Sequence, residues 1–168
     1  MLNATLRTAF LAGLDPVIVV LGAYEADIAA SITEPKVKVV TNPDWQTGQS
    51  SSLKAGVQAV PDACEGALCL LADQPQLNVH LIDAILREAD SGAVAVAPII
   101  DGRRANPVYF NRAAFEELMN ISGDQGGRAV IREIKVNYVE WLDEMQVLDI
   151  DNPKDYEILR LNYFGEAV

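Results

Sequence analysis

The sequence predicts a three-layer α/β fold with a mostly parallel sheet. Short apolar runs rich in β-branched residues alternate with amphipathic segments through most of the 168 residues, as in strands joined by crossover helices. The run at 67–72 is apolar without interruption, which is typical of a strand buried on both faces. The length suits one sizeable core, and no linker or internal repeat divides the chain, so we expect a single domain over residues 1–168.

In the first half of the chain, glycine, proline and other turn residues delimit the expected elements. Leu6 and Phe10 stand at helical spacing, and Gly13 is suited to end that helix. Asn42 and Pro43 follow a short β-branched run and supply turn chemistry. We expect a helix at 2–12, a strand at 17–21, a helix at 23–31, a strand at 37–40, a helix at 53–60 and a strand at 67–72.

The second half continues the alternation and ends in a helix with a strong start signal. Asn152, Pro153 and Asp155 are the residue types preferred at the cap, first and third positions of a helix. Residues 101–107 form a polar, basic loop between two apolar runs. We expect helices at 79–89, at 113–119, up to 131 and from 153, strands at 94–100, 108–110 and 138–141, and an alternating extended segment at 148–151.

Composition excludes some classes of function. The net charge of −11 argues against a sequence-independent grip on nucleic acid, which needs Lys and Arg against phosphates. No apolar run reaches the roughly 18 residues of a membrane span. The two cysteines lack the spacing of a zinc site or a disulfide framework, which favours a reducing, cytoplasmic location.

Asp73 is the first candidate site residue. It follows the apolar run at 67–72, and Pro75 turns the chain away from the strand. In open α/β sheets, ligands bind at the carboxyl ends of the strands. The alternative is that Asp73 only caps the helix at 79–89.

A second pair of acids, Asp149 and Asp151, lies two residues apart on an extended segment, so both side chains face the same side. Mg²⁺ prefers one or two carboxylates together with substrate phosphates and water. Two converging acidic segments would supply such a site. Helix capping is the alternative for either acid, because negative charge is stabilising near a helix N-terminus.

Two loops could contact a nucleotide or another anionic ligand. Ser50, Ser51 and Ser52 follow Gly48 at the start of a helix, where hydroxyl and N–H groups suit a base, a ribose or a phosphate. A simple N-cap would need only one of these serines. Residues 123–128 form a glycine-rich loop, which is weak evidence by itself.

Taken in order, these segments resemble the molybdenum cofactor cytidylyltransferases, which are MobA-like nucleotidyltransferases of the MocA type. The resemblance covers nearly the whole chain and depends on four motif regions occurring in the same order. They are Asn42-Pro43-Asp44-Trp45 through Gly48-Gln49-Ser50-Ser51-Ser52-Leu53, then Leu71-Ala72-Asp73-Gln74-Pro75, then Gly123-Asp124-Gln125-Gly126, and then Asp149-Ile150-Asp151-Asn152-Pro153-Lys154-Asp155.

The resemblance implies a Rossmann-like nucleotidyltransferase fold and transfer of CMP from CTP to molybdopterin bearing molybdenum, with release of pyrophosphate. It implies that Asp73 and Asp151 are the catalytic residues and bind Mg²⁺, and that a molybdenum hydroxylase or its maturation factor is the protein partner. The nucleotide would lie near Gly48, Ser50, Ser51, Ser52 and Leu53. The pterin side would be lined by Asn106, Gly123, Asp124 and Gly126.

The chain departs from this family at its N-terminus. The family begins with a strand and a glycine-rich, basic loop that cradles the triphosphate, whereas Met1 aligns with the following helix. The absent N-terminal strand would lie between the strands at 17–21 and 68–72. We therefore expect that an adjoining segment or a second copy, as in a homo-oligomer, fills the gap, or that the two strands pair directly. CTP–Mg²⁺ binding by this chain is then expected to be weak.

Two alternatives remain open at this stage. The chain could be a catalytically inert module of the same fold that holds a pterin or a partner protein. It could also be a related nucleotidyltransferase that uses GTP or another acceptor, because no residue by itself distinguishes cytosine from guanine.

Overall fold

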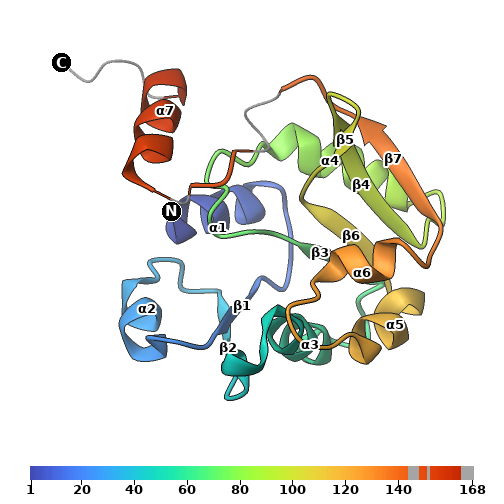
Figure 1. The fold of residues 1–168 in the computed structure, drawn as a ribbon, viewed down its shortest axis with the longest axis horizontal. Helices are drawn as coiled ribbons and strands as arrows, with labels where there is room; N and C mark the ends of the chain where they lie inside the picture. Colours follow the sequence, from blue (N-terminus) through green and yellow to red (C-terminus); the bar gives the residue numbers. More distant parts are fainter. Residues whose placement is uncertain (144–147, 151, 164–168) are drawn as a thin grey trace.

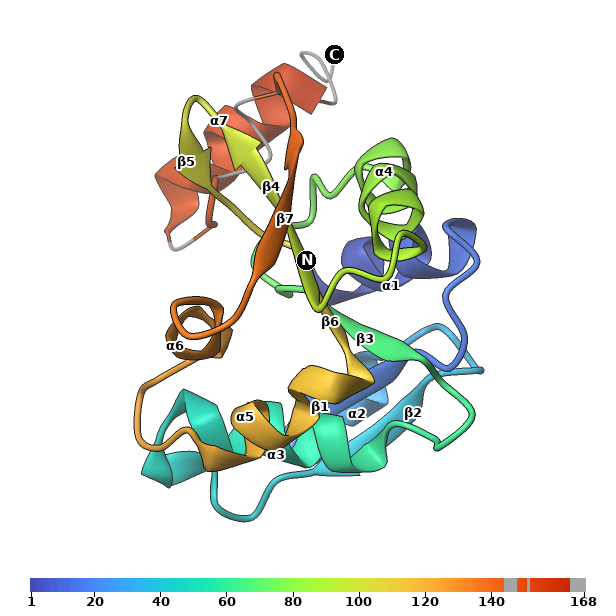
Figure 2. The ribbon, with the colours of Figure 1, turned by 90° about the vertical axis from the view of Figure 1, so that its right-hand side faces the viewer.

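The computed structural model describes residues 1–143, 148–150 and 152–163 and has an α/β architecture (Figure 1). Helices pack on both sides of a central layer of strands (Figure 2). The helices are α1 (Leu2–Leu11), α2 (Glu25–Ser31), α3 (Gln49–Ala59), α4 (Val79–Ala89), α5 (Phe115–Asn120), α6 (Gly127–Ile131) and α7 (Pro153–Tyr163). Single 3-10 turns, η1 (Trp45–Thr47) and η2 (Arg112–Ala114), precede α3 and α5. Among these described helices, none is long and apolar enough to cross a membrane.

The strands divide between two sheets. In the smaller one, β1 (Ile18–Leu21) and β2 (Lys38–Thr41) pair in parallel. The larger sheet has the order β3 (Gly66–Cys69), β6 (Val108–Asn111), β4 (Ala95–Ile100) and β5 (Arg103–Arg104), and β7 (Val136–Glu140) also pairs with β4. The extended segment expected at 148–151 forms no strand at residues 148–150.

The α/β architecture agrees with the sequence, but the larger sheet is mixed rather than mostly parallel. β3 and β4 both run antiparallel to β6, and β7 runs parallel to β4. Thus β3, β4 and β7 share one direction, whereas β5 and β6 oppose it. The reason is the short segment 101–107 between β4 and β6, because a parallel connection needs about a dozen residues or more.

β1 and β3 belong to different sheets and do not pair with each other, so the direct pairing considered from the sequence is not formed. Leu70, just after β3, packs against the apolar cluster that contains Val17, Val19 and Leu21 of the β1 region, which keeps the two sheets in contact. All residues of β3 are half-buried, whereas the apolar run predicted full burial. The difference arises because β3 has a neighbouring strand on one edge only within the described residues.

The core consists of three apolar clusters, two of which lie on opposite faces of β4. Successive side chains of β4 point to opposite faces. Ala95 and Ala97 join Phe110 beneath α3, α5 and α6, whereas Val96 packs with Leu81 of α4 on the other face. The third cluster joins α1 to β1. This packing places the loops that follow β2, β3 and α5 at the surface, where the sequence predicted the site.

Candidate active site

The first group of predicted site residues lies where the N-terminus of α3 meets the glycine-rich loop before α6. The N–H of Ser50 donates to the carbonyl of Gly123 at 3.1 Å. Gly48 has a φ of +113° and lies so close to this loop that a Cβ atom there would overlap the Gly123 carbonyl group. A Cβ at Gly126 would lie 2.6 Å from Gln49 Oε1. A glycine is therefore required at position 48, where two backbones approach each other, whereas the atom nearest to a Cβ at Gly126 belongs to a side chain that can move.

Asn42 organises the start of α3 and was not among the site residues predicted from the sequence. Only 3% of its surface is exposed. Its Nδ2 donates to the hydroxyls of Ser51 and Ser52, at 2.8 and 3.0 Å, while its Oδ1 accepts from the N–H of Asp44. Its position between a β-branched run and Pro43 was the available signal. The hydroxyls of Ser51 and Ser52 are thus already engaged in holding the loop.

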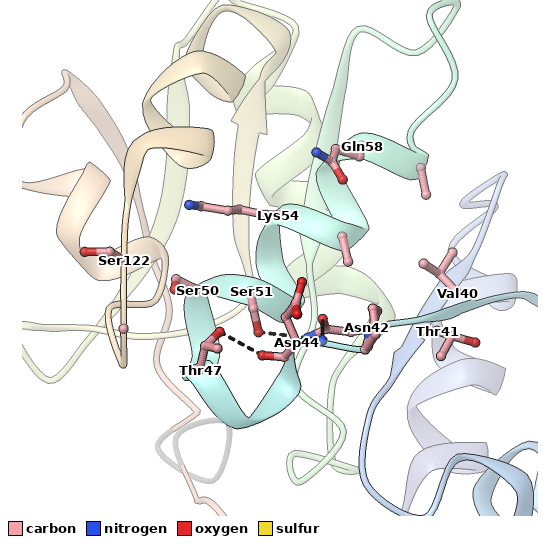
Figure 3. Close-up of a pocket in the computed structure, with 14 residues that line it drawn as sticks. Val40, Thr41, Asn42, Asp44, Thr47, Ser50, Ser51, Lys54, Gln58 and Ser122 are labelled. Atoms are coloured by element: carbon pink, nitrogen blue, oxygen red, sulfur yellow. Dashed lines mark hydrogen bonds between the residues drawn. The ribbon is translucent and has the colours of Figure 1, made fainter.

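Beside this group lies a cavity of about 780 Å³ between the end of β2 and α3 (Figure 3). Most of the residues that line it have polar side chains, and Ser50, which is 4% exposed, contributes to it. Lys54 extends across the cavity towards Ser122 in Figure 3. Among the described residues that line the cavity, Lys54 supplies the basic side chain. The cavity volume lies in the range of about 300–1,000 Å³ that is usual for small-molecule sites.

Leu53 has a packing role in this group. Its side chain is partly buried against the cluster that contains Val57 and Phe110. A Cβ atom at Gly127 would lie 3.0 Å from Phe110 and 3.9 Å from Leu53. Leu53 and Gly127 therefore help to seat the glycine-rich loop on α3.

The second group lies at the turn that follows β3. The N–H of Ile150 donates to the carbonyl of Asp73 at 3.0 Å. Gln74 Nε2 donates to Asp149 Oδ1 at 2.7 Å, and Gln76 Nε2 donates to the carbonyl of Leu148 at 2.6 Å. The structure therefore joins the two acidic segments, as the sequence predicted. The glutamines that make this connection were not among the predicted site residues.

Two other predicted residues belong to neither group as described. Asp151 lies outside the described residues. Asn106 lies between β5 and β6, on a segment anchored to β4 by the bond from Ala105 N–H to the Pro98 carbonyl at 2.9 Å. Within the described part of the chain, no hydrogen bond or ion pair links the Asn106 side chain to either group.

The electrostatics of β3 exclude Cys69 as a catalytic nucleophile. Burial raises the pKa of the Cys69 thiol to about 12. The thiolate is the reactive form of cysteine, so Cys69 is neutral and unreactive near pH 7. On the neighbouring strand β6, Tyr109 pairs with Leu68, and its pKa is also raised, because of burial and then the negative charges of Glu65 and Asp90.

The donor set at the second group fits a hard divalent cation that also binds phosphates. The described residues contain no cluster of three or more His, Cys, Asp or Glu side chains able to hold a metal by themselves. Mg²⁺ does not need such a cluster, because one or two carboxylates suffice when substrate phosphates and water complete the shell. Asp73 supplies oxygen atoms of that kind, and the segment 148–150 is hydrogen-bonded to its carbonyl through the N–H of Ile150.

Comparison with known proteins identifies the family. The MobA-like NTP transferase domain matches residues 1–139, which is most of the chain. The chain belongs to the MobA-like NTP transferase family. This result confirms the resemblance seen in the sequence and makes the protein a nucleotidyltransferase of MocA-like type.

Relatives and solved structures agree with this assignment. The purine catabolism protein PucB of Bacillus subtilis is 28% identical over 94% of this chain and 82% of its own length. Nicotine blue oxidoreductase of Paenarthrobacter nicotinovorans is 28% identical over 86% of this chain and 75% of its own length. The crystal structure of Rv0371c from Mycobacterium tuberculosis H37Rv is 26% identical, covers 94% of this chain and 82% of its own, and has a TM-score of 0.83. A manganese complex of Rv0371c has a TM-score of 0.82.

Proposed function

We propose that the protein transfers CMP from CTP to molybdopterin bearing molybdenum and releases pyrophosphate. Asp73 and Asp151 would hold Mg²⁺, and the Ser50 region with its neighbouring cavity would take the nucleotide. A molybdenum hydroxylase, or a factor that matures one, is the proposed recipient of the product. The two free cysteines are consistent with a cytoplasmic location.

The hydrogen bond from Ile150 N–H to the Asp73 carbonyl is the observation that carries the proposal. It fixes the acidic segment beside the turn that bears Asp73, and Asp151 is the next residue in the sequence. The manganese bound in the Rv0371c complex supports a divalent cation in this family. The choice of Mg²⁺ follows from the preference of that ion for carboxylates and phosphates.

The residues of the chain would act mainly by positioning charge. Phosphoryl and nucleotidyl transfers need in-line placement of two anionic reactants more than they need covalent help from the protein. A bound Mg²⁺ would supply charge neutralisation of the triphosphate oxygens. Lys54 and Ser50 would contact the nucleotide from α3, and the glycine-rich loop at Gly123 and Gly126 would allow close approach of the acceptor.

The test is a nucleotide panel with pyrophosphate detection, run with molybdopterin bearing molybdenum as acceptor. The protein should be assayed as printed and with any additional segment encoded directly upstream. We expect release with CTP from the form that carries the upstream segment, little or none from residues 1–168 alone, and a loss of about 100-fold in kcat for Asp73→Asn in the active form, as when one charge-stabilising group is removed. Asp27→Asn on the exposed face of α2 is the matched control and should retain turnover. Turnover with GTP alone would replace CTP in the proposal, and pterin binding without any turnover would favour the inert module.

A further inference from the structure

Gln74 and Gln76 bury their side chains next to Asp73, although both could reach solvent from a surface turn. Each is only 6% exposed. Burial of an amide side chain is unfavourable unless its polar atoms find partners. The partners of both Nε2 atoms lie on the segment 148–150, which is about 70 residues further along the chain. The amides therefore serve a connection between distant segments, not the local turn.

The hydrogen bond between these segments joins a donor amide at position 74 to an acceptor oxygen at position 149. Gln74 Nε2 donates to a carboxylate oxygen of Asp149 at 2.7 Å, a distance typical of a charge-assisted hydrogen bond. A glutamate at position 74 would place two carboxylates in contact. Asp149 is exposed apart from this bond, whereas Ile150 between the two acids of the segment is buried. Asp149 thus has one oxygen committed to holding the segment in place.

We propose that Gln74 is a positioning residue of the metal site and that Asp149 is its anchor rather than a metal ligand. The pair would hold the segment 148–150 beside Asp73, where the N–H of Ile150 donates to the Asp73 carbonyl at 3.0 Å. The inference rests on the proposed function, because it assumes that the cation binds at Asp73. It assigns Asp149 to holding the backbone, whereas the proposed function assigns Asp151, which lies outside the described residues, to the ion.

Isosteric substitutions separate these roles. Asp149→Asn keeps a carbonyl oxygen that can accept from Gln74, so the anchor survives while a carboxylate ligand would be lost. Gln74→Glu keeps the shape but opposes two carboxylates, so the anchor breaks. The double variant Gln74→Glu/Asp149→Asn restores a hydrogen bond with the donor and acceptor exchanged. Asn137→Ala removes a remote amide–carboxylate bond, from Asn137 Nδ2 to Glu88 Oε1 at 2.6 Å, and is the matched control.

The first measurement is the dissociation constant for Mn²⁺ alone, by electron paramagnetic resonance on the full chain. We expect Gln74→Glu to raise it by about 10-fold to 100-fold, as for residues that orient a metal ligand. Asp149→Asn and the double variant should stay within about threefold of the unsubstituted chain, and Asn137→Ala should not change it. The second measurement is hydrogen exchange of the Ile150 amide, which should be about tenfold faster in Gln74→Glu and should recover in the double variant.

The outcomes distinguish the inference from the proposed function. Loss of Mn²⁺ binding in Asp149→Asn, with no rescue in the double variant, would make Asp149 a ligand and overturn the inference alone. Unchanged Mn²⁺ affinity in Gln74→Glu would do the same, provided that Asp73→Asn abolishes binding. A chain that binds no Mn²⁺, or whose Mn²⁺ site survives Asp73→Asn, would refute the proposed metal site and with it the role of the pair.

Discussion

Replacing Gly48 by alanine should weaken both the fold and the candidate site, because two separate costs arise at this position. The backbone has a φ of +113° and a ψ of 172°, a region that is essentially restricted to glycine and costs other residues about 1–3 kcal/mol. The new Cβ would also overlap the Gly123 carbonyl and lie 2.8 Å from Asp124 N. Both neighbours are backbone atoms, so the loop itself must move.

The magnitude follows from these contacts. Movement of the loop would break the bond from Ser50 N–H to the Gly123 carbonyl, which is worth about 0.5–1.5 kcal/mol net. Alanine restricts the unfolded chain and returns about 0.4–1 kcal/mol. These terms lower the free energy of unfolding by about 0.5–4 kcal/mol, and the overlap with the Gly123 loop adds to this loss; a typical domain has only roughly 5–15 kcal/mol. Equilibrium urea unfolding measures this change, with the slope m expected to stay constant.

Substitutions at two other glycines measure the cost of backbone strain separately from the cost of atomic overlap. Gly92→Ala introduces a side chain at a φ of +84° with nothing within 4 Å, so only strain of about 1–2 kcal/mol applies, less the entropy gain. At Gly126, φ is −90° and the nearest atom is the movable Gln49 Oε1 at 2.6 Å. Gly126→Ala should therefore cost less than about 1 kcal/mol. If Gly48→Ala matched Gly92→Ala within about 0.5 kcal/mol, the close approach of the two loops would be refuted.

Three further predictions concern the rest of the chain. Because β1 and β3 each have one edge without a neighbouring strand in the described residues, we expect the chain 1–168 to self-associate in sedimentation experiments, and a stable monomer would contradict this. Asn152 Oδ1 accepts from the N–H groups of Lys154 and Asp155, so Asn152→Ala should cost α7 about 0.5–2 kcal/mol, seen as faster amide exchange confined to that helix. The pKa of Cys69 is raised from 9.0 to about 12, so the unfolded chain loses this proton first. Stability should therefore fall between about pH 9 and 12 by up to about 4 kcal/mol, and this fall should be smaller in Cys69→Ala.

The sequence by itself determined the elements whose signals are local. The helix at 79–89 has the same ends in the structure as in the prediction, because its apolar period and its start and stop signals act within a few residues. The start of α7 was predicted from Asn152, Pro153 and Asp155, and their reciprocal hydrogen bonds are formed. The association of the acidic segments at Asp73 and Asp149 was also expected, though only from the carboxyl-edge rule and the family resemblance.

Tertiary structure alone decided the features that depend on chain reversal and on contacts between distant segments. The direction of β6 follows from a short connection after β4, and an apolar run carries no information on which neighbour it will meet. The half-burial of β3 depends on which strands flank it. The approach of Gly48 to Gly123 and the bond from Gln74 to Asp149 join residues about 75 apart. Such pairs leave no periodic pattern, because a hydrogen bond or a close backbone contact constrains two positions whose separation along the chain is arbitrary.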